Sequence, residues 1–497
     1  ERTNAWAFTS RPQDLVELIE FWIEKDCLGT TRSEIIQNSI TRRLAERNQN
    51  HADTCTLSEE KLCQGAKLLA AAVTLAKNSV IEIPGGRNNT SGIPVHCILP
   101  DWNDKEQNNL LSRPLFDEAI YGTVRFHHRT VREYLTAKWF AELLNGGTPR
   151  REIEYLFFRE QYGLNIVTPA LRPILSWLAL WDEKIRERIY RIAPEILLEG
   201  GDLGSFPPEI RRKLLYKFCE YMIEGKIIFF GQLYETARYF AEPVFTDDIR
   251  ELIPKNADNE HLAMFLFHIV ELGKLEKTLP EVMATALNKD AELYARIIAF
   301  RAIKAIAPEE TQESIRQSFL DETPELKREL LMELLEDIQP TEPILNWLFE
   351  CLKKSEPKEP YSIDRLGNKL ITLIDMTQIE LLPRFIANLN ELLELPPVIE
   401  RRHCEVSEKF QWLMAPACNA VRRLIQQRHP ETLKENVFSI LRKASFIHDY
   451  GSFDHTDIRR DLETSVPEWD ELNRLLFWLE VRESQKVKKK DTERLVD

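Results

Sequence analysis

The stretch RFHHRTVREYLTAKWFAELL, residues 125–144, carries the clearest structural signal in the chain. Apolar residues recur at a spacing of four, and two aromatic residues widen the same face: Val131, Leu135, Trp139 and Leu143, with Tyr134 and Phe140. This spacing predicts an amphipathic helix. The helix is expected to end at Asn145-Gly146-Gly147, because glycine favours the position after a helix, and Pro149 follows shortly afterwards.

Two histidines stand at the entrance of this helix. His127 and His128 lie between Arg125 and Arg129. An imidazole can donate a hydrogen bond to an anion, and a helix N-terminus adds a partial positive charge. We therefore interpret the pair as a candidate phosphate site rather than a metal site. The alternative is an ordinary helix start that carries exposed histidines.

The same residues resemble the end of the winged-helix part of NACHT-type STAND ATPases. The family pattern there is Phe-x-His, four residues, and then Glu-Tyr/Phe-Leu-Ala-Ala. The residues of this chain that fall on it are Phe126, His128, Glu133, Tyr134, Leu135 and Ala137, whereas Thr136 stands where alanine is usual. The resemblance implies that His128 contacts the β-phosphate of bound ADP and helps to hold the protein inactive.

Residues 1–26 contain a second match to the family. Pro12 follows a serine and an arginine and opens a predicted helix, as proline often does. In NACHT proteins a Pro-x-x-Leu turn opens a helix of the small helical domain, and the resemblance gives Pro12 that turn's role of packing on the adenine. A competing alignment puts Arg11 on the sensor strand, facing the γ-phosphate. We prefer the first, because residues 29–46 then fit the next helix of the family.

Composition narrows the class of protein. A chain of 497 residues is long enough for three or more domains, and 43% hydrophobic with 29% charged residues is typical of a globular protein. Only 17 residues are glycine, which favours helices over hairpins. The net charge of −14 argues against general nucleic-acid binding.

The cysteines and the apolar runs indicate the cellular compartment of the protein. The eight cysteines are scattered without a C-x-x-C pair, which indicates reduced thiols in the cytoplasm rather than disulfides or a zinc site. No apolar run reaches about 18 residues and no signal peptide is visible, so no membrane association is expected. Because the chain starts at Glu1 and stops in a charged stretch, we expect it to be a piece of a longer protein.

Residues 57–147 have the outline of a winged helix. A predicted helix opens at Ser58 and continues through the small residues of 65–72, which permit close contact with another helix. Residues 80–84 and 121–126 read as short strands, and the glycine-containing loop 85–94 is a candidate wing. That loop lacks the order G-x-x-x-x-G-K-[ST], so it is not a phosphate-binding loop.

From residue 148 onward the sequence predicts helices almost throughout. The aromatic stretch 152–205 is expected to pack on the winged helix rather than to form a binding groove. From 254 to 360, helix-length segments alternate with turns marked by prolines, without a strict repeat. This resembles a degenerate solenoid of HEAT- or TPR-like helical pairs, whose curved surface suits the binding of another protein. The predicted breaks fall at Pro207-Pro208, Pro254, Pro280, Pro308, Pro324, Pro340, Pro343, Pro357, Pro360, Pro396-Pro397, Pro416, Pro430 and Pro467.

No catalytic motif is present in the sequence. There is no Walker A, no clear Walker B, no G-x-S-x-G and no H-E-x-x-H. One polar stretch contains residue types that bind metals: His448, Asp449, Asp454, His455 and Asp457. A glycine- and serine-containing polar turn is the preferred interpretation, and no metal site is expected.

The sequence thus predicts a mostly α chain: a helical lid and a winged-helix domain, followed by an α-solenoid. We expect a helical domain of the ATPase module at 1–56, the winged helix at 57–147 and a helical linker packed on it at 148–253. The solenoid sensor would occupy 254–497 and be incomplete at its C-terminal end. Nearly the whole chain, including the late segment NRLLFWLEVRESQ, resembles the antiviral STAND ATPases of prokaryotes, the AVAST group.

This resemblance implies a mechanism. ADP, later exchanged for ATP with Mg²⁺, would be bound mostly by residues outside this sequence. A phage protein, large terminase first and portal second, would bind the solenoid, and self-association would activate an N-terminal effector such as a nuclease. Nucleic acid would be contacted only through that effector. The alternative is a helical-repeat scaffold protein with no nucleotide-dependent activity, and a Walker A motif upstream of Glu1 would distinguish the two.

Overall fold

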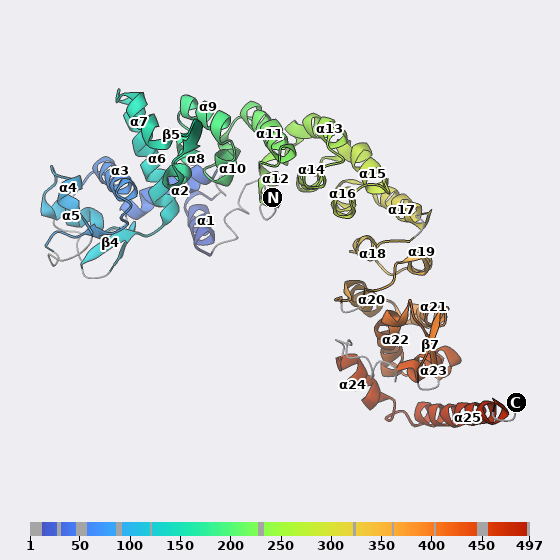
Figure 1. The fold of residues 1–497 in the computed structure, drawn as a ribbon. Coiled ribbons are helices and arrows are strands. Elements are labelled where there is room, and N and C mark those ends of the chain that lie inside the picture. The colour runs from blue at the N-terminus through green and yellow to red at the C-terminus, as the bar shows by residue number, and fades with distance from the viewer. Residues whose placement is uncertain are drawn as a thin grey trace. The chain divides into compact units, whose positions relative to one another are not determined.

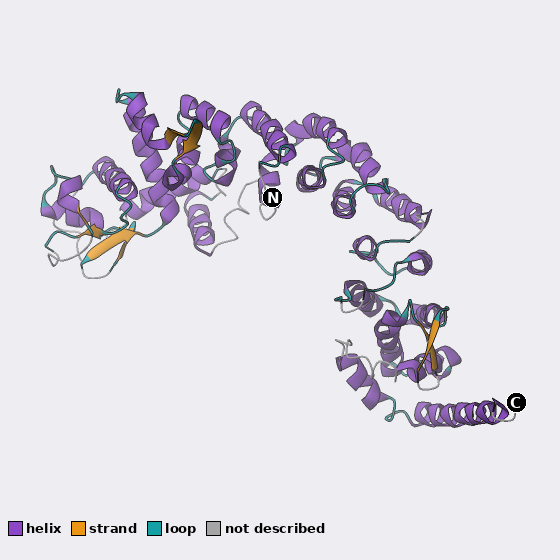
Figure 2. Ribbon diagram, in the orientation of Figure 1, coloured by secondary structure: helices purple, strands orange, loops and turns teal. Residues whose placement is uncertain are grey.

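Helices dominate the protein, and strands form only three small sheets among the residues that the structure describes (Figure 2). The computed structural model describes residues 12–26, 31–45, 57–85, 92–119, 122–226, 233–321, 325–359, 362–401, 404–444 and 456–494. The chain forms two compact units, residues 1–248 and residues 249–497. The predicted mostly α fold with a solenoid is confirmed.

The N-terminal unit begins with two helices, α1 (Pro12–Lys25) and α2 (Arg32–Ala45). Leu18 and Phe21 of α1 form a buried cluster with Ile35 of α2. The start of α2 is capped from a distant part of the chain, because the backbone N–H of Ser33 donates to Asp202 Oδ2 at 2.8 Å. This bond fixes the position of the first turn of α2.

The next segment has the order of elements of a winged helix (Figure 1). Its elements are α3 (Glu59–Leu75), β1 (Ile81–Glu82), β2 (Ile93–Pro94), α4 (Val95–Ile98), α5 (Asp104–Leu111), β3 (Phe116–Glu118), β4 (Thr123–Phe126) and α6 (Arg129–Asn145). The sheet has the order β2-β1-β4-β3, in which β1 and β2 run parallel and the other neighbours are antiparallel.

The position of the wing differs from the prediction. A wing is an antiparallel hairpin, whereas β1, before this loop, and β2, which is formed by its last two residues, are parallel. The hairpin is formed instead by β3 and β4, with Phe116 opposite Phe126 in the register. The antiparallel hairpin therefore lies outside the predicted wing at 85–94, of which residues 86–91 are not described.

Helix α6 is covered on two sides, by α3 and by α8 (Arg172–Leu178). Thr136 and Ala137 are fully buried, whereas Trp139 and Leu143 of the predicted apolar face are only half-buried. The predicted apolar face of α6 was therefore too narrow, because the prediction assumed that only one neighbouring element packs against this helix. The Thr136 hydroxyl is satisfied inside the core by donating to the carbonyl of Arg132 at 2.8 Å.

The linker continues with short helices, one hairpin and longer helices. They are α7 (Arg150–Phe157), β5 (Phe158–Gln161), β6 (Leu164–Val167), α8, α9 (Glu183–Ile192), α10 (Ile196–Glu199), α11 (Pro208–Ile223), α12 (Leu233–Ala237) and α13 (Thr246–Lys255). The β5–β6 hairpin lies where only helix was predicted. Its turn, Tyr162-Gly163, has positive φ at both residues, 54° and 73°, which is the conformation of a two-residue hairpin turn.

The aromatic stretch of the linker packs on α6, as its composition predicted. The rings of Trp177 and Trp181 both stand edge-on to Tyr134, with centroids 5.2 and 5.4 Å away. Phe157 meets Phe140 at 4.8 Å, also edge-to-face. Such pairs add roughly 0.5–1.5 kcal/mol each beyond the burial of their apolar area. The linker is thus part of the core around α6.

Asp182 links α7 to α9 and makes stability depend on pH. It accepts two hydrogen bonds from Arg150, at 2.9 and 2.7 Å, and caps α9 by accepting from the N–H of Ile185. Burial alone would raise the pKa of Asp182, but these hydrogen bonds outweigh it and hold the pKa below its ordinary value of 3.8. A lowered folded-state pKa gives stability that is complete above pH 3.8 and is lost as the pH falls through the folded-state pKa.

Asp182→Asn keeps a good helix cap but removes the charge. We expect it to lower the free energy of unfolding by about 1 kcal/mol at neutral pH, since a charge-assisted bond becomes a neutral one. In denaturant titrations this difference should shrink in acid. A difference that stayed constant from neutral pH to pH 3 would contradict the assignment.

The C-terminal unit is built from stacked helix pairs. Its elements are α14 (Glu260–Gly273), α15 (Leu279–Leu287), α16 (Leu293–Ile306), α17 (Glu309–Ser318), α18 (Arg328–Leu334), α19 (Glu342–Lys354), α20 (Arg365–Met376), α21 (Leu382–Leu393), β7 (Val398–Arg401), β8 (Cys404–Ser407), α22 (Met414–Gln426), α23 (Glu435–Ala444), α24 (Thr456–Ser465) and α25 (Asp470–Arg494). Helices α14, α16, α18, α20, α22 and α24 each contact the next in this series, and α19, α21 and α23 form a second row. Two parallel rows of this kind are a helical solenoid.

Several of the predicted proline breaks lie where a new helix starts. Pro280, Pro308 and Pro343 lie at the first positions of α15, α17 and α19 or immediately before them. Two predicted breaks are wrong: Pro254 lies in the last turn of α13, and Pro416 is the third residue of α22. Proline is tolerated in a first turn, because the backbone N–H that it lacks has no partner within the helix there. The β7–β8 hairpin was not predicted either.

Candidate anion-binding cavity

A cavity of about 470 Å³ lies at the N-terminus of α6, within the N-terminal unit. We call it the α6 cavity. Its walls come from the starts of α2 and α6, from α8 and from the end of α10; the lining residues used below are Arg32, His128, Arg129, Arg172, Trp177 and Gly201. Its volume is within the range of small-molecule sites, about 300–1,000 Å³. These segments are far apart in the sequence, and tertiary packing brings them together.

The structure distinguishes the two histidines. His128 lines the cavity and is the N-cap of α6, where its Nδ1 accepts from the N–H of Thr130 at 3.2 Å. The proton of the neutral ring is then on Nε2, the nitrogen through which it can donate. His127 is not among the described residues that line the cavity, and its Nδ1 lies 2.7 Å from Asp117 Oδ1 on β3. His128 is therefore the histidine of this pair that lines the cavity.

Three arginines line the same cavity as His128. Arg129 donates from Nε to Glu133 at 2.6 Å, and Arg172 donates to Glu195 at 3.1 Å. The guanidinium of Arg32 lies 5.6 Å from the centroid of the Trp177 ring, which is a cation–π arrangement. Sequence reasoning noted only Arg129 of these three. No motif marks Arg32 or Arg172, since only the packing of α2 and α8 brings them to the cavity.

Buried groups fix the walls of the cavity. Gly201 has φ +70°, and a Cβ there would lie 2.4 Å from the carbonyl oxygen of Ser176, so no other residue fits. Asp202, next to it, is the buried cap of α2. Tyr134 donates its hydroxyl to Gln37 of α2 at 3.1 Å, and burial raises the pKa of Tyr134, so the hydroxyl stays neutral. The end of α10, α2 and α6 are thereby held together.

The other two predicted site residues are not placed by the structure. Pro12 is the first residue of α1, so the predicted helix start is correct, but its side chain lies outside the described residues. Arg11 lies outside them entirely. Their contacts with a nucleotide remain predictions.

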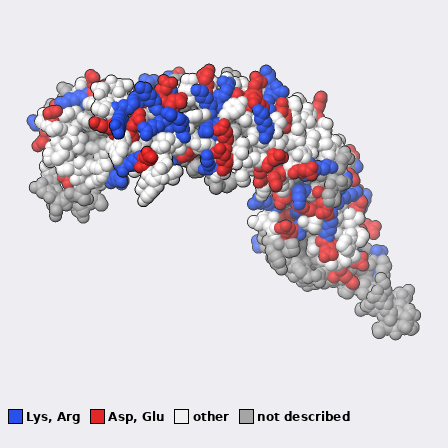
Figure 3. All heavy atoms as spheres, turned by 45° about the horizontal axis from the view of Figure 1, so that its top comes forward, with Lys and Arg blue, Asp and Glu red and all other residues white. Residues whose placement is uncertain are grey.

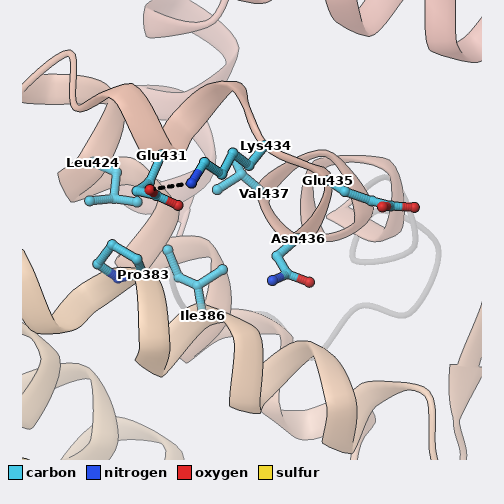
Figure 4. A pocket seen from close by; sticks show the side chains of 8 residues that line it. All are labelled: Pro383, Ile386, Leu424, Glu431, Lys434, Glu435, Asn436 and Val437. Carbon is cyan, nitrogen blue, oxygen red and sulfur yellow. Dashed lines mark hydrogen bonds and ion pairs between the residues drawn. The ribbon is translucent and has the colours of Figure 1, made fainter.

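A second cavity, of about 370 Å³, lies between α21, α22 and α23 in the C-terminal unit (Figure 4). Apolar atoms of Pro383, Ile386 and Leu424 line part of it. Glu431 and Lys434 point toward one another and form an ion pair, and the carboxylate of Glu435 is directed away from that pair. The acids thus do not converge on a common point, and the site lacks the arrangement of an acid–base pair.

Within the described residues, metal-ligating side chains do not gather in groups of three or more, and several thiols are buried. Of the polar stretch considered above, Asp457 is described and exposed, and residues 448–455 are not described. Burial raises the pKa of the thiols of Cys219, Cys351 and Cys418 to about 12, so these free cysteines stay protonated.

Two observations concern surfaces. In Figure 3, Lys and Arg side chains gather in groups over the N-terminal unit, with Asp and Glu side chains between them. Within the described ranges, no helix is both long enough and apolar enough to cross a membrane.

Comparison of the chain with models of known protein families gives no match. Comparison with curated proteins gives none either. The residues around the α6 cavity therefore supply the strongest observation on function.

Proposed function

We propose that the chain is the nucleotide-responsive and sensing part of an antiviral STAND ATPase of the NACHT type. In this proposal ADP binds beside His128 and keeps the protein inactive. The single observation that supports it most is the position of His128, the N-cap of a 17-residue helix, in a cavity lined by three arginines.

The chemistry of the α6 cavity suits a phosphate. The N-terminus of α6 contributes a partial positive charge, and arginine side chains offer planar sets of N–H donors that match phosphate oxygens. His128 adds a ring N–H as a further donor at the start of α6. Most contacts with ADP or ATP and with Mg²⁺ would come from residues outside this sequence, which has no Walker motif.

The helical solenoid would be the sensor. Stacked helix pairs present a long surface that a large, folded partner can contact at many points. Large terminase is our first choice of partner and portal protein our second, and their binding would favour exchange of ADP for ATP. The protein would then self-associate in the cytoplasm and activate its effector.

His128→Ala in the parent protein should weaken ADP binding by about tenfold or more, because a hydrogen bond to a charged group contributes about 1.5–3 kcal/mol. Basal activity should rise as ADP is retained less well. Isothermal titration calorimetry with ADP measures the first effect. His127→Ala is the matched control and should change the affinity by less than about threefold, since His127 pairs with Asp117 instead.

Equal ADP affinity of His128→Ala and the wild type would refute the role of His128. Absence of any nucleotide binding by the parent protein would favour the second candidate, a helical-repeat scaffold. That candidate has the solenoid itself in its favour.

A further inference from the structure

We infer that the helical linker is itself part of the ligand site: Arg172 of α8 and Arg32 of α2 bind a diphosphate group together with His128. The inference rests on the proposed function in taking a nucleoside diphosphate as the ligand. It goes further by assigning two anion-binding residues outside the motif that carries the resemblance, and by giving the ligand a structural effect on the linker.

The cavity has an excess of positive charge, which suits an anion. Its lining residues include three arginines and one glutamate, in a chain whose net charge is −14. Glu133 already pairs with Arg129 and Glu195 with Arg172, so Arg32 supplies the excess positive charge that an anion would balance. A diphosphate carries several negative charges and more acceptor oxygens than a carboxylate, so it matches this set.

Arg172 is the residue through which the linker would contact the ligand. It is the first residue of α8, and its partner Glu195 immediately precedes α10. The side chains of this pair are 32% and 21% exposed, so the pair is neither fully solvated nor sealed from the cavity. A phosphate group, with its greater charge, competes with Glu195 for the guanidinium. Ligand binding then exchanges a carboxylate partner for a phosphate partner.

Arg32 is held in place by an aromatic support. Trp177 is only 2% exposed and is itself fixed edge-on by Tyr134. A guanidinium above a ring keeps its N–H groups in its own plane, where they remain able to donate to an anion. The cap that Asp202 provides at Ser33 fixes the backbone next to Arg32. The side chain is thus oriented before a ligand arrives, which lowers the entropic cost of binding.

A diphosphate in this position would connect three segments that are separate in the sequence. Arg32 comes from the helices before the winged helix, His128 from its last helix, and Arg172 from the linker. The ligand would therefore clamp the linker against α6. Its loss would remove one of the contacts that hold α8 and α10 in place.

The test is calorimetry on the purified chain of residues 1–497, titrated with pyrophosphate, with ADP and with orthophosphate. The wild type should bind pyrophosphate more tightly than orthophosphate. Arg172→Ala should weaken pyrophosphate binding by about tenfold or more, and Arg172→Lys should restore part of it. Glu195→Gln should strengthen binding severalfold, because it removes the competing carboxylate without emptying its space.

A matched control excludes a general effect of losing an arginine. Arg188 pairs with Glu154 and lies over the Phe158 ring, and it is not among the described residues that line the cavity. Arg188→Ala should leave pyrophosphate affinity unchanged. Circular dichroism spectra and melting curves of each variant show whether the fold is retained, and Glu195→Gln keeps the test decisive if Arg172→Ala does not fold.

The outcomes separate this inference from the proposed function. Pyrophosphate affinity that is the same in the wild type, Arg172→Ala and Glu195→Gln overturns the inference, as does a wild-type chain that binds none of the three probes. ADP binding that depends on His128 in the parent protein would still support the proposed function in either case. If pyrophosphate binding depends on Arg172 but ADP binds no more tightly than pyrophosphate, the result supports a diphosphate site at Arg172. It does not support a nucleotide as the ligand of that site.

Discussion

Trp177→Ala is expected to lower the free energy of unfolding of the N-terminal unit by about 3–5 kcal/mol, the usual cost of removing a large buried aromatic side chain. Trp177 is 2% exposed and joins α8 to α6 through its edge-on contact with Tyr134. The same side chain supports Arg32 at the cavity wall. The substitution should therefore reduce both stability and pyrophosphate affinity.

Urea unfolding followed by circular dichroism measures the loss of stability without depending on tryptophan fluorescence. Trp478→Ala is the control, since Trp478 of α25 is 65% exposed and its removal should change stability by less than about 0.5 kcal/mol. If Trp177→Ala cost less than about 1 kcal/mol, the packing of α8 on α6 in the structure would not be the packing in solution.

Deletion of residues 260–497 should abolish binding of the phage trigger protein and leave ADP binding unchanged. The cut falls between α13 and α14, at Asn259, whose side chain caps α14. All residues described as lining the α6 cavity lie within the N-terminal unit, so nucleotide binding should survive the deletion. Pull-down with purified large terminase or portal protein measures trigger binding, and calorimetry measures ADP binding.

Full-length variants provide the control for this deletion. Charge reversal at exposed solenoid positions, such as Glu310 and Glu329, keeps the helices and should abolish the response to the trigger while ADP still binds. Full-affinity capture of the trigger by the deletion variant would place the sensor outside the solenoid. The circular dichroism spectrum of the deletion variant shows whether residues 1–259 remain helical.

The sequence by itself determined the helices, because their signals are local. Apolar residues spaced four positions apart and the Asn-Gly-Gly end signal predict a helix close to the observed α6. Prolines mark several of the helix starts in the solenoid. His128 was also found from the sequence, through its place before α6. The β5–β6 hairpin also had a local signal, the turn at Tyr162-Gly163. That signal was missed because the surrounding sequence predicts helices.

Only the tertiary structure decided how distant segments meet. Periodicity shows that α6 has an apolar face, but not that α3 and α8 cover it from two sides and bury Thr136. The Phe-x-His pattern picks out His128, but the sequence does not show what His127 does; its pairing with Asp117, on the neighbouring strand of the sheet, comes from the structure. The α6 cavity likewise exists because long-range packing brings Arg32 and Arg172 to one helix end, and such packing leaves no periodic trace in the sequence.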